Sequence, residues 1–368
     1  MAVNAEQLLY RSPGGIGRYT SELLTVMPRM FPADEVIAFT ALHPRRHVRA
    51  AFDVAGVDCD ARMLPIPRPL LYDAWHTLGI PHIPRAWRAD LVHAPSLAVP
   101  PRSGVPLVVT VHDAAADLYP EAFPPRGRRF HRKGMMAAAR RADIVLTVSD
   151  AAASEITDNS DIPSDRIRVV HNGISPRVVE PSRRDEILAG RGLLGETYIF
   201  WVGSLEPRKG VGTLVAAVAE LRRRSGAPRF QLVLAGYDGW LQPELAAEHV
   251  VQLGRVDDEE LWALYAGAAV FAFPSIHEGF GLPVVEAMSQ GAPVVASDIP
   301  ALREVTAGAA MLVTPGSVEQ WARALGDLLE SVEERDRLAS AGRARSEQLS
   351  VEVMISGIRD VYRELTGR

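Results

Sequence analysis

The sequence predicts an α/β protein of two domains, each a parallel sheet covered by helices on both faces. At 368 residues the chain exceeds the ~250 to 300 residues at which one hydrophobic core stops growing. Short continuous apolar runs, typical of buried parallel strands, alternate with amphipathic helical stretches. The alternation is interrupted once, by the polar stretch RVVEPSRRDEILAGRGLLGE at 177–196, and then begins again. These observations predict two sheets joined near residue 180.

We therefore place a first domain at 1–180 and a second at 181–349, and we expect a last helix, at 350–368, to pack back on the first domain. The pattern is helical from Ser317 to the end of the chain. The predicted strands are 2–9, 36–39, 106–112, 143–149, 198–203, 230–236, 250–254, 270–275, 293–298 and 310–314.

The composition is that of a globular protein, with 47% hydrophobic and 23% charged residues. A single cysteine, Cys59, excludes disulfides within the chain and zinc sites built on paired cysteines, and it favours a reducing compartment. The first residues lack a basic segment before an apolar one, and no apolar run reaches ~18 residues. We expect a cytoplasmic protein without a signal peptide or spanning helix.

The charge is uneven but does not point to nucleic acid. Residues 1–180 hold 21 Lys and Arg against 19 Asp and Glu, and the remainder holds 19 against 26. A predicted helix at 126–141 has seven Arg or Lys. It is either a solvated basic face or a surface that meets anionic lipid at the inner face of a membrane. We expect Phe130, Met135 and Met136 on its buried side.

Three glycine-rich segments are candidates for anion binding. Gly190 to Gly195 fits the string G-x-G-x-x-G, but it follows a helix and precedes a strand, the reverse of a dinucleotide-binding loop, so we set it aside. Gly14 and Gly15 instead follow a predicted strand and open a helix, where backbone N–H groups can receive a phosphate. A plain strand-to-helix turn is the alternative.

The segment GSLEPRKG, at 203–210, repeats that arrangement of strand, loop and helix in the second domain. Arg208 and Lys209 lie at the start of the helix, so they can neutralise a diphosphate held by the free amides. The alternative is a solvated basic helix start.

The most specific segment is PSIHEGFGLPVVEAMSQGAPVVASD, at 274–298. Glu278 ends a loop after a strand, and Glu286 lies about two turns into the predicted helix. Gly279 and Gly281 allow the backbone to approach a ligand. The two carboxylates would contact opposite ends of an elongated ligand.

The last segment resembles the donor-site motif of the retaining glycosyltransferases of family 4. The segments GGIGRYT, His112-Asp113, VVHNGI, GSLEPRKG and LGRVDDEEL follow in the order that family shows. The resemblance covers nearly the whole chain. It implies the GT-B fold, in which two Rossmann-like domains with parallel sheets face each other across a cleft, the first domain binding the acceptor and the second the nucleotide-sugar donor.

The resemblance also implies residue roles. His112, Glu278, Lys209 and Arg208 would be catalytic, with His112 facing the transferred sugar. Glu278 would bind sugar hydroxyls, and Glu286 the ribose. The implied donor-binding positions are Gly14, Gly15, Ser204, Arg208, Lys209, Gly254, Arg255, Val256, Glu278, Gly279, Phe280, Gly281, Leu282 and Glu286.

Two features of the sequence bear on the chemistry. Relatives often have arginine at the position of Ser204, and Arg208 is our candidate for the missing charge. The one Asp-x-Asp string, Asp58-Cys59-Asp60, lies outside the motifs that carry the resemblance, and we predict no metal and no cofactor. The residues of these motifs resemble those of the mannosyltransferases that build polysaccharides. This resemblance implies GDP-mannose as donor and a glycan or lipid-linked acceptor.

Two rival functions remain open from the sequence. A sugar-nucleotide epimerase of the same fold would release nucleotide without an acceptor. A two-domain sugar-binding protein would bind without catalysis.

Overall fold

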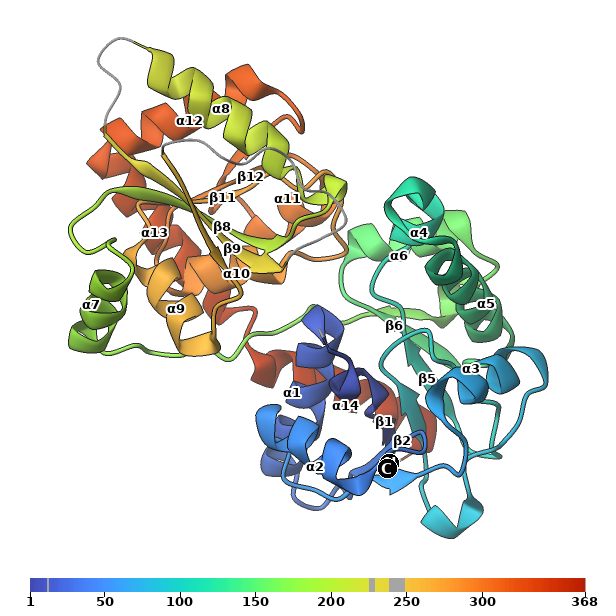
Figure 1. Cartoon of the computed structure of the whole chain (residues 1–368). Coiled ribbons are helices and arrows are strands. Elements are labelled where there is room, and N and C mark those ends of the chain that lie inside the picture. The colour runs from blue at the N-terminus through green and yellow to red at the C-terminus, as the bar shows by residue number, and fades with distance from the viewer. Residues whose placement is uncertain (12, 225–228, 238–248, 368) are drawn as a thin grey trace. The chain divides into compact units, whose positions relative to one another are not determined.

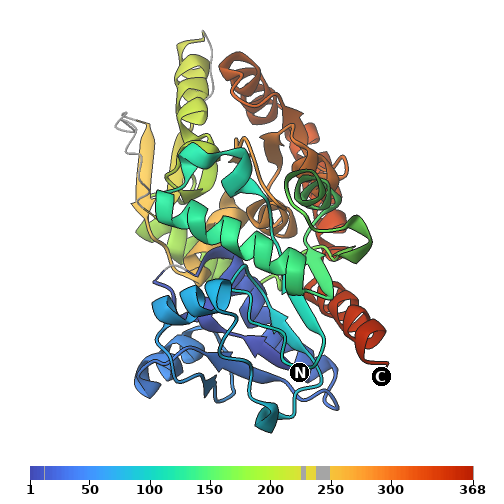
Figure 2. The ribbon, with the colours of Figure 1, turned by 90° about the vertical axis from the view of Figure 1, so that its right-hand side faces the viewer.

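The computed structural model describes residues 1–11, 13–224, 229–237 and 249–367 and divides into two compact units (Figure 1). The first unit comprises residues 1–173 together with 351–368, and the second comprises residues 174–350. Both ends of the chain therefore belong to the first unit (Figure 2).

The first unit is built on a parallel sheet whose described strands follow the order β3-β2-β1-β4-β5-β6-β7. The order reverses direction between β1 and β4, which makes the carboxyl ends of these two strands the expected place for a ligand. The strands are β1 (Ala2–Asn4), β2 (Ile37–Thr40), β3 (Arg62–Met63), β4 (Val92–Ala94), β5 (Leu107–Thr110), β6 (Ile144–Thr147) and β7 (Ile167–Val169).

Successive side chains of these strands point to opposite faces, so Ala2 and Val3 enter different core clusters. The helices of the unit are α1 (Gly14–Met30), α2 (Arg45–Val54), α3 (Arg68–Thr77), α4 (Ala115–Leu118), α5 (Pro125–Arg141), α6 (Asp150–Asn159) and α14 (Val351–Thr366), with 3₁₀ turns η1 (Glu6–Leu9), η2 (Arg85–Trp87), η3 (Pro120–Ala122) and η4 (Ser164–Arg166). Helices α3 and α5 cover one face. Helices α1, α2 and α14 cover the other.

The last helix, α14, packs beside α1 (Figure 1). Met354, Ile355 and Ile358 enter the core with residues of α1, and Arg359 pairs with Asp34 at 2.6 Å. A segment from the end of the chain thus completes the first sheet's cover.

The first strand is shorter than the predicted 2–9, because the chain leaves the sheet after Asn4. The Asn4 side chain accepts a hydrogen bond from the Glu6 amide, which starts the turn η1. The buried Glu6 carboxylate then accepts from the Ala41 amide and contacts His43 at 2.6 Å. A buried carboxylate needs hydrogen-bond partners, and Glu6 reaches them from the turn η1 and not from a continued strand.

The second unit repeats the same topology. Its described strands follow the order β10-β9-β8-β11-β12-β13, all parallel, with the reversal between β8 and β11. The strands are β8 (Tyr198–Ser204), β9 (Gln231–Tyr237), β10 (Val250–Gly254), β11 (Val270–Phe273), β12 (Val294–Ser297) and β13 (Met311–Val313). The helices are α7 (Pro181–Gly190), α8 (Val211–Arg223), α9 (Asp258–Gly267), α10 (Leu282–Ser289), α11 (Pro300–Thr306), α12 (Val318–Glu330) and α13 (Val332–Glu347), with the turn η5 (Pro207–Lys209).

Both faces of this sheet are also buried. Ile199 and Trp201 pack toward α8 and α12. Phe200, from the alternate position, meets Tyr265 of α9 at a ring distance of 5.3 Å. The alternation confirms the prediction of continuous apolar strands between two helical layers.

The polar stretch at 177–196 is a helix over much of its length rather than an irregular linker. It forms α7, which belongs to the second unit and contacts α9. Arg183 pairs with Glu259, and Arg191 pairs with Glu260. The glycine string of 190–195 follows α7 and precedes β8, the order that excludes a dinucleotide-binding loop.

The basic segment forms helix α5, as the sequence predicts. Met135 is buried and Phe130 is partly buried against the core, but Met136 is 44% exposed, so its prediction as a core residue was wrong. Met136 is rotated about 100° around the helix axis from Met135, which turns its side chain away from the core. In the described residues, no helix combines the length and apolarity needed to cross a bilayer.

Candidate active site

Two loops meet at the reversal point of the second sheet. One follows β8 and comprises 205–210, and the other follows β11 and comprises 274–281. The Ile276 amide donates to the Arg208 carbonyl oxygen at 2.9 Å. Gly210 has φ +65°, and a Cβ there would lie 2.1 Å from the Pro274 carbonyl oxygen, so only glycine permits this approach.

The contact between the loops brings two cations onto one carboxylate. Lys209 Nζ lies 2.6 Å from Glu278 Oε1, and Arg208 Nη1 lies 3.6 Å from Glu278 Oε2. Arg208 also donates to the His277 carbonyl oxygen at 2.8 Å and pairs with Glu206 at 3.1 Å. The side chains of the two cations are 14% exposed and those of the two carboxylates 10% exposed. We call Glu206, Arg208, Lys209 and Glu278 the ion-pair cluster.

The surroundings of Glu278 act on its pKa in opposite directions. Burial raises the pKa of this carboxyl, but the charges of Lys209 and Arg208, with the hydrogen bond from Lys209 and the hydroxyl of Ser275, together lower it by more. The net shift is downward from 4.5. Glu278 is therefore an anion at neutral pH and a poor proton donor.

Ser204, the last residue of β8, contacts the ion-pair cluster. Its hydroxyl donates to Glu206 Oε1 at 3.0 Å, the same oxygen that Arg208 contacts at 3.1 Å. Glu206 thus holds Arg208 through an ion pair within the same loop. It is a site residue that sequence reasoning missed, although an acidic residue next to two cations inside GSLEPRKG was a usable signal.

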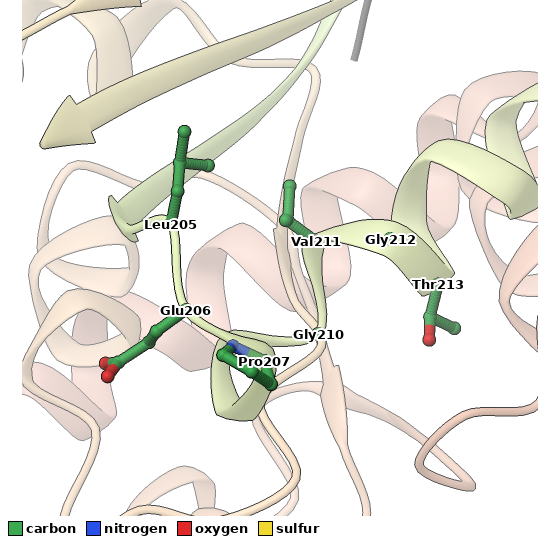
Figure 3. Close-up of a pocket in the computed structure, with 7 residues that line it drawn as sticks. All are labelled: Leu205, Glu206, Pro207, Gly210, Val211, Gly212 and Thr213. Carbon is green, nitrogen blue, oxygen red and sulfur yellow. The ribbon is translucent and has the colours of Figure 1, made fainter. Parts of the chain in front are cut away.

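A pocket of about 210 Å³ opens beside the cluster, at the start of α8 (Figure 3). Its lining residues are Leu205, Glu206, Pro207, Gly210, Val211, Gly212 and Thr213. The first turn of α8 has no side-chain cap, so its N–H groups are available to an anion. The sticks in Figure 3 show this first turn continuing directly from the loop that carries Glu206.

The segment predicted as Glu278 to Glu286 forms a second helix start. Gly281 is the N-cap of α10 with φ +103°, and no side chain caps the helix. Gly279 and Phe280 are buried before it, and Leu282 is the first helical residue. Uncapped amides here suit contacts to a polar ligand.

Glu286 lies one turn into α10 rather than the predicted two, because the helix begins at Leu282. Its carboxylate is buried and accepts a hydrogen bond from the Tyr265 hydroxyl at 2.9 Å. Tyr265 was not foreseen, since nothing in a helical pattern marks one tyrosine as a partner of a carboxylate 21 residues away.

Three predicted donor-binding residues lie elsewhere in the same unit. Gly254 ends the edge strand β10, and Arg255 and Val256 follow it before α9. Strand β10 is separated from β8 by β9. The structure therefore places these residues at the carboxyl edge of the sheet but two strands away from the ion-pair cluster.

In the first unit, Gly14 and Gly15 form the exposed first turn of α1. Pro13 is the N-cap and offers no side-chain hydrogen bond. Anion binding by the amides of this turn stays a prediction.

His112 also belongs to the first unit and lies two residues beyond β5, in the loop after the strand rather than at its end. Its Nε2 lies 2.9 Å from the Pro95 carbonyl oxygen. Burial lowers the pKa of His112, so the ring is neutral at physiological pH. A carbonyl oxygen only accepts hydrogen bonds, so Nε2 carries the proton and Nδ1 presents a lone pair.

Comparisons with known proteins agree with this architecture. A family model described as "Glycosyltransferase Family 4" matches residues 13–178, and one described as "Glycosyl transferases group 1" matches 184–345. O-antigen chain mannosyltransferase B of Escherichia coli is 30% identical over 95% of this chain and 96% of its own length. MMP alpha-(1->4)-mannosyltransferase of Mycolicibacterium hassiacum is 36% identical over 67% of this chain and 62% of its own length.

Solved structures share the fold. Anabaena HepE, crystallised with UDP and glucose, has a TM-score of 0.74 at 20% identity, with 99% of each chain covered. WaaG, a glycosyltransferase of lipopolysaccharide biosynthesis, has a TM-score of 0.71 at 18% identity, with 100% of each chain covered.

The fold is GT-B, and the protein is an enzyme that transfers sugars. Among such enzymes, the chain belongs to glycosyltransferase family 4, as a mannosyltransferase-type member.

Proposed function

We propose that the enzyme transfers mannose from GDP-mannose to a hydroxyl of a glycan or lipid-linked acceptor, with retention of anomeric configuration. The observation that carries the proposal is the ion-pair cluster, which holds Lys209 and Arg208 beside the uncapped start of α8. The choice of mannose rests on the two mannosyltransferase relatives.

In this proposal, Lys209 and Arg208 neutralise the diphosphate as it departs. A lysine ammonium has three donors, and Glu278 takes one of them in the structure, which leaves capacity for phosphate oxygens. Each charge-assisted hydrogen bond contributes roughly 1.5 to 3 kcal/mol, more than the ~0.3 to 1 of a helix dipole. The two cations therefore outweigh the helix start as a source of stabilisation.

Glu278 and Glu286 would bind opposite ends of the donor. Glu278, kept anionic by its two cations, accepts hydrogen bonds from sugar hydroxyls. Glu286, oriented by Tyr265, accepts from the ribose. His112, in the first unit, would offer its Nδ1 lone pair to a hydroxyl of the transferred sugar, the role that the family resemblance implies.

The transfer step balances without a protein base. The bond from the sugar anomeric carbon to the diphosphate oxygen breaks while the acceptor oxygen forms a bond to that carbon on the same face. The departing diphosphate oxygen takes the acceptor's proton. A covalent route through two carboxylates about 5 Å apart, as in retaining hydrolases, suits this site less well, since Glu278 already pairs with two cations.

We also propose that transfer needs no metal, because Lys209 and Arg208 supply the positive charge. Full activity in excess EDTA is the expected result. Activity that EDTA removes and Mg²⁺ or Mn²⁺ restores would contradict this part alone.

A donor panel tests the function directly. We expect GDP and GDP-mannose to raise the melting temperature more than UDP, ADP and their sugars do, because ligands that bind the folded state stabilise it. With an acceptor present, NMR should detect an α-mannoside as the product of GDP-mannose. Release of an epimerised sugar without acceptor would favour an epimerase instead.

Helix α5 supports a further part of the proposal, contact with the inner face of a membrane that carries the acceptor. Arg128, Arg132 and Arg140 are exposed, and the apolar Met136 lies among them at the helical spacing of four. Anionic lipids attract such a face with about 1 kcal/mol per basic residue. Salt-sensitive pelleting with anionic vesicles, reduced in Arg128→Glu/Arg132→Glu, is expected; equal recovery with neutral vesicles would contradict membrane contact.

A further inference from the structure

A buried chain of hydrogen bonds crosses the first unit and joins three segments far apart in the sequence. His93, on β4, is 0% exposed. Its Nδ1 lies 2.6 Å from the Tyr362 hydroxyl of α14, and its Nε2 lies 2.8 Å from Thr110 Oγ1 on β5. Thr110 Oγ1 in turn lies 3.1 Å from the Tyr19 hydroxyl of α1.

The protons of this chain can be counted. Burial lowers the pKa of His93 to about 3, so its ring is neutral and has one N–H and one lone pair. The ring and each of the three hydroxyls have one donor proton, so four protons are available for three hydrogen bonds. The neutral ring donates through one nitrogen and accepts through the other, so its bonds to Tyr362 and Thr110 run in the same direction along the chain. The four groups therefore form one connected hydrogen-bond network.

The Tyr19 end of this hydrogen-bonded chain contacts His112. The Tyr19 ring meets the His112 ring edge-on, with centroids 5.2 Å apart and planes at 88°. On its other side the same ring meets His93 at 6.3 Å, again edge-on. With Nε2 bound to Pro95, the position of Tyr19 fixes the tilt of the His112 ring and hence the direction of its Nδ1 lone pair.

We propose that Tyr19, Thr110, His93 and Tyr362 form a positioning network that orients His112 for sugar transfer. The proposal rests on the role of His112 in the proposed function. The network makes Tyr362, in the C-terminal helix, a positioning residue for a ring it does not touch.

The polarity of the network favours this role over packing alone. Burying four polar groups costs free energy that apolar side chains of the same shape would not. A hydrogen-bonded chain gains in return a single geometry, because hydrogen bonds are directional and dispersion contacts are not. This geometry fixes the His112 ring through its contact with Tyr19.

The test compares three variants that shorten the network with matched variants outside it. Tyr19→Phe, Tyr362→Phe and Thr110→Val each remove one hydroxyl. Tyr198→Phe and Thr40→Val are the controls. Tyr198 is also buried and donates to the Leu264 carbonyl oxygen at 2.7 Å, and Thr40 is a buried strand residue that donates to the Ala41 carbonyl oxygen.

We expect the network variants to lower kcat by about tenfold with little change in the donor KM, while the controls retain kcat. In ¹⁵N NMR of the histidine side chains, the His112 signal should shift in Tyr362→Phe. Thr110→Ser, which keeps the hydroxyl, should retain both the kcat and the His112 signal of the wild type. Thermal unfolding identifies any variant that fails to fold, and the remaining variants then decide the question.

The failures are distinguishable. If His112→Ala lowers turnover but Tyr19→Phe and Tyr362→Phe behave like the controls, the network is refuted and the proposed function stands. If His112→Ala keeps normal turnover, the role of His112 in the proposed function is refuted. An unmoved His112 signal in Tyr362→Phe overturns the positioning network whatever the activities are.

Discussion

The first strand-to-helix loops of the two units occupy the same place in the same topology, yet they are built differently. Each follows the strand next to the reversal of its sheet, β1 in one unit and β8 in the other. Each leads through a glycine of left-handed backbone, Gly14 at φ +61° and Gly210 at φ +65°, into an uncapped helix. The second loop contributes two cations of its own, Arg208 and Lys209, to the buried ion-pair cluster. The described part of the first loop contributes instead a buried carboxylate, Glu6, beside His43 and Arg68.

The difference separates two ways to bind an anion. In the described residues, the start of α1 offers exposed backbone amides without a side-chain cap, worth ~0.3 to 1 kcal/mol from the helix dipole. The start of α8 adds Lys209 and Arg208, which are oriented in advance by Glu278 and Glu206. We infer that the second loop stabilises developing charge and that the first only accommodates it.

The strongest test of this contrast is Lys209→Ala. We expect kcat to fall by about 10² or more, as for loss of one transition-state donor. The chain has one other lysine, Lys133, whose pair with the exposed Asp73 spans 3.8 Å, so Lys133→Ala is a matched control with unchanged kcat. Steady-state kinetics of both variants checks the prediction; near-normal turnover in Lys209→Ala would refute the role of the cluster.

The two glycines allow a paired test of stability. In Gly210→Ala the new Cβ meets the Pro274 carbonyl oxygen, and the left-handed backbone is also strained, so we expect a loss of about 2 to 3 kcal/mol. Gly14→Ala has the same strain but nothing within 4 Å of the new Cβ, so about 1 kcal/mol is expected. Denaturant unfolding measures both. Equal losses would show that the contact between the loops carries no stability.

Removal of the buried carboxylate on α10 should act on binding. Glu286→Ala is expected to raise the donor KM by about tenfold with a smaller change in kcat, because it removes a contact to the ribose in the ground and transition states alike. Tyr265→Phe should change KM in the same direction by less, since it loosens Glu286 without removing it. An unchanged donor KM in Glu286→Ala would exclude ribose contact.

The smallest effect concerns pH. The pKa of Glu278 is lowered in the folded state, so its contribution to stability is complete above the unfolded value of 4.5 and is lost as the pH falls through the folded value. The difference in melting temperature between the wild type and Glu278→Gln should be constant near neutral pH and should narrow below about pH 4.5. A difference that stays constant down to the acid transition would contradict the lowered pKa.

Much of the fold is readable from the residues in order. Continuous apolar runs such as VFAF at 270–273 bury both faces of a strand and can only be covered by helices, so the two parallel sheets follow from composition and period. The glycine-rich starts of α1, α8 and α10 are readable in the same way, because left-handed backbone and uncapped amides are local properties. Non-local contacts explain the error in the length of β1, since the buried Glu6 after this strand has partners that lie 35 and 37 residues away.

The sequence by itself determined which side chains are available, placing Lys209 and Glu278 at the ends of strands whose carboxyl edges coincide. Only the tertiary structure decided that these two residues pair, 69 positions apart, that Glu206 holds Arg208, and that Tyr362 reaches His93 across 269 positions. The reason is physical. Propensity and hydrophobic period act over a few residues, whereas an ion pair or a buried hydrogen bond depends on distances that exist only once the sheets have formed.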